Sequence, residues 1–184
     1  MIHAISIGLI TNIGLSSNSD GHKIQRKPVF GSRKDVFVST IPKVTKLTKN
    51  KISEICPIYL RYRESADVKS SIAEVQKYLQ TEFKKGDDSI VVARVADKPV
   101  GFLHYGVERS TLRDAERIRL KAMFVDEDYR GKGVSKQLLQ MLQEEAGERE
   151  IVVKARRSND VSPFLYLNNG FKEDEEYFHL VYRK

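Results

Sequence analysis

Apolar residues recur at helical spacing in two segments in the first half of the chain. Residues 52–62 and 72–83 carry an apolar residue every three or four positions, which places those side chains on one face of a helix. Ser71 and Glu74 have the spacing of a capping box ahead of the second segment, and Gly86 lies where that helix should stop. The pattern predicts two successive amphipathic helices.

The segments that follow favour extended structure. Residues 89–95 and 99–107 are rich in β-branched and aromatic residues and are separated by the turn residues 96–98, which predicts an antiparallel hairpin. Residues 117–125 then alternate strictly, so we expect a strand with one buried and one more polar face. The apolar set is Ile118, Leu120, Ala122 and Phe124, and the opposite set is Arg117, Arg119, Lys121 and Met123.

Five shorter patterns complete the order of elements. Residues 44–47, 151–155 and 177–182 read as strands, and residues 134–147 repeat apolar residues at helical spacing up to a closing glycine. A Ser-Pro pair at residues 162–163 places an N-cap residue before a proline at the first helical position, which predicts a short helix. The order strand, helix, helix, three strands, helix, strand, helix, strand predicts a mixed α/β domain with an open sheet.

Length and composition limit the class of protein. A chain of 184 residues with 40% apolar and 31% charged residues fits one globular domain plus an extension. No apolar run approaches the ~18 residues of a spanning helix, so no membrane association is expected. The single Cys56 excludes an intrachain disulfide framework and a multi-cysteine metal site, and its apolar surroundings favour a buried small side chain over a catalytic thiol.

The net charge of +7 is concentrated near the start of the chain. Residues 1–65 hold 11 Lys and Arg against 4 Asp and Glu, while residues 66–184 hold 21 of each kind. Such charge solubilises a surface or attracts an acidic partner, but no arginine-rich or aromatic-interleaved motif supports nucleic-acid binding.

The first 19 residues contain no Lys, Arg, Asp or Glu and follow no helical or strand period, so we expect poor order there. They lack the charged leader of a secretory signal. Their composition resembles that of type III secretion signals. The expectation is an extension over residues 1–41 before a domain over residues 42–184, with a cytoplasmic location or, as the alternative, export by a type III-like route into a host cell.

The turn after the alternating strand carries candidate chemistry. A strand that ends in Arg130, Gly131, Lys132 and Gly133 and then opens a helix gathers unpaired backbone N–H groups at a helix N-terminus, where phosphate oxygens bind. The glycines let the backbone close around a ligand, although a tight strand-to-helix turn also uses glycine for steric reasons alone. The spacing matches neither a Walker loop nor the three-glycine dinucleotide turn.

These residues resemble the GNAT superfamily of N-acetyltransferases. Residues 130–135 match its signature Q/R-x-x-G-x-G/A, except that Ser135 stands at the last small position. The resemblance covers about residues 42–184. A second family motif, N-x-x-A-x-x-L-Y-x-x-x-G-F, is matched in register by Asn159, Ser162, Leu165, Tyr166, Gly170 and Phe171.

The resemblance implies a centrally splayed open sheet flanked by helices, acetyl-CoA as donor and an amine as acceptor, with no metal. It places the thioester against Met123, Phe124 and Val125, where a backbone N–H would stabilise the oxyanion. It also implies that Asn159 hydrogen-bonds the pantetheine arm. The pyrophosphate would be held by the backbone of Arg130, Gly131, Lys132, Gly133, Val134 and Ser135.

Tyr166 matches the family's general acid, which would protonate the departing thiolate, although a tyrosine between two leucines also fits a core position. No general base is assigned. Many members place a glutamate on the motif strand, where this chain has Arg117, Arg119 and Lys121. Glu108, Glu116 and, in reserve, His104 are the nearest candidates.

The acceptor is left open, because the two walls expected around it carry opposite charge. Residues 48–85 are basic in part, whereas residues 173–176 are all acidic. A protein lysine, a protein N-terminus, a polyamine or another small amine would each fit. The alternatives to an acetyltransferase are a CoA-binding regulatory pseudoenzyme and a basic nucleic-acid-binding domain.

Overall fold

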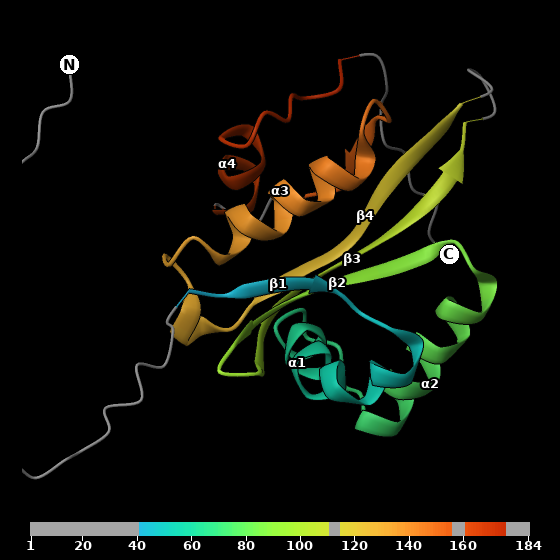
Figure 1. Cartoon of the computed structure of the whole chain (residues 1–184), viewed down its shortest axis with the longest axis vertical. Coiled ribbons are helices and arrows are strands. Elements are labelled where there is room, and N and C mark those ends of the chain that lie inside the picture. Colours follow the sequence, from blue (N-terminus) through green and yellow to red (C-terminus); the bar gives the residue numbers. More distant parts are fainter. Residues whose placement is uncertain (1–40, 111–114, 156–160, 176–184) are drawn as a thin grey trace, which may run out of the picture. The chain divides into compact units, whose positions relative to one another are not determined.

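The computed structural model describes residues 41–110, 115–155 and 161–175 (Figure 1). The expected last strand, at residues 177–182, and almost all of the expected extension lie outside these ranges. The elements in chain order are β1 (Lys43–Lys46), η1 (Lys49–Lys51), α1 (Ile52–Glu64), α2 (Ile72–Lys85), β2 (Asp88–Val95), β3 (Lys98–Arg109), β4 (Glu116–Val125), η2 (Glu127–Tyr129), α3 (Val134–Ala146), β5 (Ile151–Val153) and α4 (Val161–Leu167).

The five described strands form one sheet in the order β1-β2-β3-β4-β5. Neighbouring strands are antiparallel except for β4 and β5, which are parallel. Helices α1 and α2 cover one face of the sheet, and α3 and α4 cover the other (Figure 1). The prediction of a mixed α/β unit with an open sheet is confirmed over the described residues.

Local signals account for where the second helix begins and ends. Ser71 accepts a hydrogen bond from the backbone of Glu74 and Glu74 returns one to the backbone of Ser71, which is the predicted capping box. Gly86 ends the helix at a φ of 92°, where a side chain would be strained. The first helix continues through Pro57 at its sixth position.

The hairpin between β2 and β3 turns at Ala96 and Asp97. Both residues have positive φ, 47° and 61°, which is the conformation that a tight two-residue hairpin requires. Alanine is costly there, by about 1–2 kcal/mol, because its Cβ approaches the following carbonyl. The predicted antiparallel pairing is confirmed, and β3 begins at the third residue assigned to the turn, Lys98.

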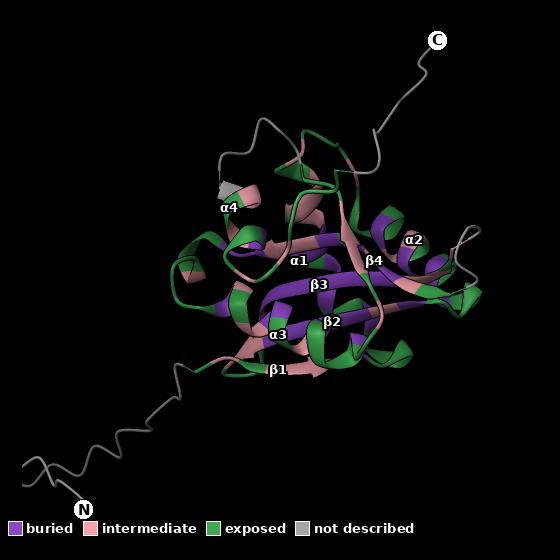
Figure 2. Cartoon of the chain, turned by 90° about the horizontal axis from the view of Figure 1, so that it is seen from above, coloured by how far each residue is buried: buried purple, intermediate pink, exposed green. Residues whose placement is uncertain are grey.

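Two apolar cores lie on opposite faces of the sheet, and the central strands β2 and β3 are buried along most of their length (Figure 2). One core joins the sheet to α3 and Tyr166, and the other joins it to α1 and α2. This double burial explains why β2 and β3 read as nearly continuous apolar runs.

A bulge in β4 overturns the expected division of that strand into two faces. The register pairs His104 with Ala122 and Tyr105 with Leu120, so Lys121 is an extra residue on β4. Ile118 and Leu120 pack toward α3, whereas Ala122 and Phe124 pack toward α1 and α2. The prediction that these four residues share one face was wrong, because one inserted residue reverses the alternation beyond it.

Helix α4 also differs from the prediction. It begins at Val161, so Ser162 is a helical residue and not the N-cap, and Pro163 lies within the first turn. A proline is tolerated there because the first N–H groups of a helix have no partner within it. None of the helices in the described ranges is long and apolar enough to cross a membrane.

Candidate active site

The sheet opens along the second half of β4. Strand β5 pairs with β4 only from Ile118 to Leu120. Among the described residues, no strand lies beside β4 from Lys121 to Val125. The open edge therefore begins at the bulge and runs to the end of the strand.

The bulge decides which backbone groups face this open edge. The N–H of Ile118 donates to the Glu150 carbonyl on the β5 side at 2.8 Å, and the N–H of Asp126 donates to Val100 on the β3 side at 2.9 Å. Because N–H groups alternate along a strand, those of Met123 and Val125 point to the open edge. If the strand alternated regularly through Lys121, with no bulge, these two N–H groups would point to β3 instead.

Immediately after β4 the chain forms the predicted glycine turn. Gly131 and Gly133 have positive φ, 72° and 78°, and a Cβ on either would meet nothing within 4 Å. Gly133 is the N-cap of α3. The backbone N–H groups of residues 131–136 have no acceptor among the described residues, as expected for the first turn of a helix. The turn presents a set of free N–H groups and the positive end of a helix dipole.

A glycine on β3 lets this helix start close to the sheet. A Cβ at Gly101 would lie 3.1 Å from the Phe124 carbonyl oxygen and 3.2 Å from Cγ1 of Val134, the first residue of α3. Such contacts are tighter than a side chain tolerates without movement of its neighbours. Gly101 thereby brings the N-terminus of α3 against the end of β4.

Two arginines hold the strand end and the turn in place. Arg130 donates from Nε to the Val125 carbonyl at 3.1 Å, and its guanidinium lies 5.8 Å from the Phe124 ring centre. Arg61 of α1 forms an ion pair at 2.7 Å with Asp126, which is buried. Helix α1 is therefore anchored to the residue between β4 and the glycine turn.

Tyr166 lies in α4 and is buried against the ring of Phe171, with ring centres 5.4 Å apart. Burial raises the pKa of its phenol, which a side-chain hydrogen bond with Ser162 only partly offsets. The hydroxyl therefore keeps its proton at neutral pH. Tyr62 of α1, on the other side of the sheet, also contributes to the rise in the pKa.

Glu108, one of the two carboxylates considered as a base, is held by arginines. Its carboxylate accepts hydrogen bonds from Arg119 at 2.6 Å and from Arg117, and these lower its pKa. Glu116 is exposed at the far end of β4, where it pairs with Arg149 at 3.7 Å. The two arginines therefore leave Glu108 poorly suited to take a proton at neutral pH.

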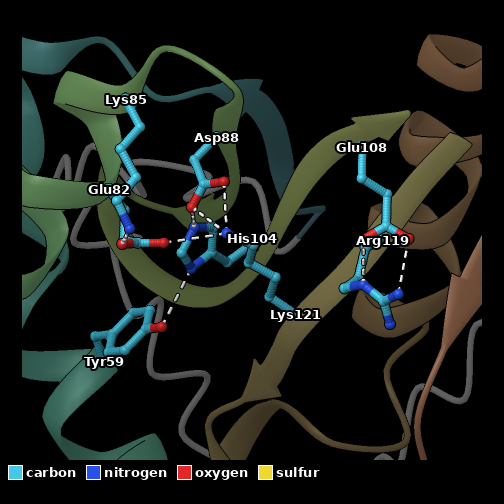
Figure 3. Close-up of polar contacts among 8 residues, drawn as sticks. All are labelled: Tyr59, Glu82, Lys85, Asp88, His104, Glu108, Arg119 and Lys121. Carbon is cyan, nitrogen blue, oxygen red and sulfur yellow. Dashed lines mark hydrogen bonds and ion pairs between the residues drawn. The ribbon is translucent and has the colours of Figure 1, made fainter. Parts of the chain in front are cut away.

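His104 is fully buried, with hydrogen bonds on both ring nitrogens (Figure 3). Sequence reasoning placed it on the second hairpin strand but missed its partners Tyr59 and Asp88. Only the spacing of Asp88 at the start of a buried strand could have drawn attention to that carboxylate. Asp126 and Arg61 were missed for the same reason, because their pairing joins separate elements.

The structure brings together most of the residues expected to bind the donor. Met123, Phe124 and Val125 lie at the open edge, and Arg130 to Ser135 follow directly. Asn159 lies outside the described residues. No group of three or more His, Cys, Asp or Glu residues within the described ranges is arranged to hold a metal ion.

Comparisons with known proteins agree with the fold. Residues 86–173 match the family model described as the acetyltransferase (GNAT) domain. No curated protein sequence matches the chain. The fold is similar to that of a probable acetyltransferase, with a TM-score of 0.72 and 23% identity over 77% of this chain and 97% of that one.

Two further solved structures share the fold. A ribosomal-protein-alanine N-acetyltransferase from Brucella melitensis biovar Abortus 2308 has a TM-score of 0.64 and 20% identity, over 77% of this chain and 99% of that one. An aminoglycoside acetyltransferase from an uncultured soil metagenomic sample, solved with sisomicin, has a TM-score of 0.65 and 18% identity, over 80% and 99%.

Proposed function

The chain belongs to the GNAT family of acetyltransferases, and on that premise we propose that it transfers an acetyl group from acetyl-CoA directly to the nitrogen of an amine. One observation carries the proposal. The open edge of β4, with the Met123 and Val125 N–H groups directed outward, leads straight into a glycine turn whose N–H groups have no partner among the described residues.

In this proposal acetyl-CoA lies along both the glycine turn and the open edge of β4. The N–H groups of residues 131–135 and the N-terminus of α3 hold the pyrophosphate, because they combine free donors with the positive end of the helix dipole. Lys132 lies beside the turn, over the ring of Tyr129 at 5.3 Å, and adds positive charge. Asn159 remains the proposed partner of the pantetheine arm.

The thioester then lies along β4. An outward N–H at Met123 or Val125 donates to the carbonyl oxygen and stabilises the negative charge of the tetrahedral intermediate. The acceptor nitrogen attacks the carbonyl carbon, the C–N bond forms, and the C–S bond breaks as the intermediate collapses. Tyr166 supplies the proton that the departing thiolate takes up.

The acceptor is proposed only as an amine. Two of the three solved structures named above carry very different acceptors in their names, a ribosomal-protein alanine and an aminoglycoside. A fold shared at this level of identity does not select between a protein N-terminus, a protein lysine, a polyamine and another small amine.

The proposed catalytic domain covers residues 42–184, and residues 1–41 are proposed as an extension to it. The suggestion of a type III-like secretion signal rests on residues 1–19, outside the described ranges, and has no structural support. A cytoplasmic location likewise stays a prediction.

We test the proposal by measuring acetyl-CoA binding by calorimetry and release of the CoA thiol with a panel of amines. Gly133→Val should weaken donor binding at least about tenfold, because valine resists positive φ and obstructs the turn. Gly86→Val is the matched control, since Gly86 has a similar φ of 92° and open surroundings but ends α2.

Equal donor affinity in the Gly133→Val and Gly86→Val proteins would show that the glycine turn does not bind the donor. Tight donor binding without thiol release from any amine would favour the CoA-binding regulatory protein instead. There is a reason to consider that second outcome, since β4 carries arginines where many family members have a glutamate.

A further inference from the structure

The side chain of Arg130 covers one backbone group at the open edge of β4. The Phe124 carbonyl faces β3, since a Cβ added to Gly101 would lie 3.1 Å from its oxygen. Carbonyl groups alternate along a strand as N–H groups do, so the carbonyl of Val125 points to the open edge. Nε of Arg130 donates to that oxygen at 3.1 Å. The last carbonyl of the open edge is therefore bonded to a side chain of the same molecule.

Two further contacts orient the Arg130 side chain. Its guanidinium lies over the Phe124 ring, 5.8 Å from the ring centre. Nη1 also lies 3.3 Å from a carboxylate oxygen of Glu127. Both side chains of that ion pair are more than half exposed, so the pair contributes little. The bond to Val125 and the ring of Phe124 therefore decide where the guanidinium lies.

The place of Arg130 in the chain brings a second partner within its reach. Arg130 directly precedes Gly131, the first residue of the glycine turn, and this turn is the proposed site of the pyrophosphate. A change of side-chain rotamer is enough to direct the guanidinium from the strand toward the turn. One side chain thus serves both parts of the proposed donor site.

The two partners differ in the bonds that they can form with Arg130. The Val125 carbonyl is neutral and accepts a single hydrogen bond, from Nε. A pyrophosphate is an anion with several acceptor oxygens, and a guanidinium pairs with phosphate oxygens through two parallel, charge-assisted hydrogen bonds. The exchange of the carbonyl for a pyrophosphate is therefore favourable.

The arm of the donor uses the same carbonyl. Acetyl-CoA carries amide groups between its thioester and its pyrophosphate, and an extended chain of amides pairs with an exposed strand edge through N–H and carbonyl groups. The open edge from Met123 to Val125 offers both kinds of group to such a chain. At Val125 the arm and Arg130 compete for one oxygen.

Resting on the proposed function, we infer that Arg130 selects the donor by its pyrophosphate. A donor that carries a pyrophosphate draws the guanidinium to the glycine turn and frees the Val125 carbonyl for the arm. A thioester without phosphate, such as S-acetylpantetheine, has to break the bond between Arg130 and Val125 and offers no replacement. Arg130 thereby couples occupation of the turn to release of the strand edge, and no covalent bond changes in this step.

The test compares acetyl-CoA with S-acetylpantetheine as donors for the wild-type chain, Arg130→Met and Arg130→Gln, using the amine found in the panel. Both variants lose the positive charge and keep an unbranched side chain. Nε2 of glutamine takes the place that Nε has in arginine, so it can still donate to the Val125 carbonyl, whereas methionine cannot. The two variants therefore differ chiefly in the bond to Val125.

The two donors should respond in opposite directions to Arg130→Met. With acetyl-CoA, kcat/KM should fall about tenfold in both variants, because neither side chain brings a charge to the pyrophosphate. With S-acetylpantetheine, kcat/KM should rise about threefold or more in Arg130→Met. Arg130→Gln should show no such rise, because its amide still covers Val125. A merely structural role would move both donors in the same direction.

Arg149→Met is the matched control. Arg149 also donates from Nε to a backbone carbonyl at 3.1 Å, that of Ala146 at the C-terminal end of α3. The substitution removes the same charge and the same kind of bond, but at the end of α3 that lies away from the glycine turn. With either donor, kcat/KM should stay within about twofold of wild type.

The pattern of rates decides the question. Opposite changes with the two donors in Arg130→Met, and no rise with S-acetylpantetheine in Arg130→Gln, support selection by Arg130. Any other pattern, in a chain whose wild type uses acetyl-CoA, rejects the selection and leaves the proposed function standing. Rates with S-acetylpantetheine too slow to detect in every protein count as such a pattern. A wild-type chain that acetylates no amine from acetyl-CoA refutes both.

Discussion

At the scale of single residues, Tyr166 combines the two properties expected of a proton donor. Its phenol is held protonated by burial, and its hydroxyl is positioned by a side-chain hydrogen bond with Ser162. The ring also packs in the core against Phe171. A substitution that keeps the ring and removes the oxygen can therefore separate its chemistry from its packing.

Tyr166→Phe should lower kcat about 10²–10⁴-fold, the usual value of general-acid assistance, or roughly 3–5 kcal/mol of barrier. Acetyl-CoA affinity and the unfolding midpoint should change little, because the packing of the ring is retained. Steady-state kinetics and donor calorimetry on the same preparation measure both. Turnover within about twofold of wild type would show that Tyr166 is only a packing residue and that solvent protonates the thiolate.

Residues joined by local motifs could be found from the sequence, and residues joined by tertiary contacts could not. The glycine turn and Tyr166 each belong to a contiguous pattern. Tyr59 and Asp88 meet His104 across 45 and 16 positions of the chain, and no spacing rule connects a helix residue with two strands. The sequence consequently suggested His104 only as a lone candidate.

At the scale of elements, α2 is set by local motifs, whereas the form of β4 depends on tertiary contacts. The start and end of α2 depend on Ser71, Glu74 and Gly86, which act within the helix itself, so the boundaries could be predicted. The existence of β4 was also predicted correctly. Its bulge depends on how Lys121 sits between two pairs formed with β3, and the alternation of the strand alone contains no trace of that register.

Hydrogen exchange should reveal which amides β4 leaves available. We expect Met123 and Val125 to exchange fast in the free protein, since their N–H groups point away from β3. Phe124 and Asp126 should exchange slowly, because they point toward it. Saturating acetyl-CoA should slow exchange at Met123, at Val125 or at both by about tenfold or more.

Residue-resolved exchange measured by NMR with and without donor provides the check, with Phe124 and Asp126 as internal controls. If exchange at both outward amides were the same in the two states, the donor would not lie along this edge. The proposed oxyanion contact would then have to be abandoned.

At the scale of the whole molecule, ion pairs connect the layers that the two cores hold together. Arg94 of β2 binds Glu54 of α1 at 3.0 Å, and Lys46 of β1 binds Glu145 of α3 at 2.8 Å. These pairs are largely exposed, so each is worth little. Asp88 differs, because its side chain is buried where β2, β3, β4 and α2 meet.

Asp88→Asn should destabilise the fold by about 2–4 kcal/mol at pH 7, since it leaves His104 and Lys121 without their charged acceptor. The folded-state pKa of Asp88 is depressed, so its contribution is complete above the ordinary pKa of 3.8 and is lost as pH falls from there through the lower folded-state pKa. The difference between wild type and variant should therefore shrink in acid.

Urea unfolding at pH 7 and at a pH below the ordinary Asp pKa of 3.8 measures both quantities, and Asp87→Asn serves as the control because the neighbouring Asp87 is exposed. A variant with wild-type stability at pH 7, or a difference that does not depend on pH, would show that Asp88 contributes nothing through its charge.

The extra residue on β4 also determines how this chain tolerates changes in length. Loss of Lys121 itself would only remove the bulge, because Leu120 and Ala122 already pair with the neighbouring residues Tyr105 and His104. Insertion of one residue directly after Ala122 would instead act on the strand as a frameshift acts on a coding sequence, since every position beyond the insertion would exchange its inner and outer assignments. Met123 and Val125 would turn their amides into the sheet, and Phe124 would turn its ring to the other core. Single-residue insertions beyond the bulge should therefore be far less acceptable than substitutions, and longer insertions there should come in pairs of residues.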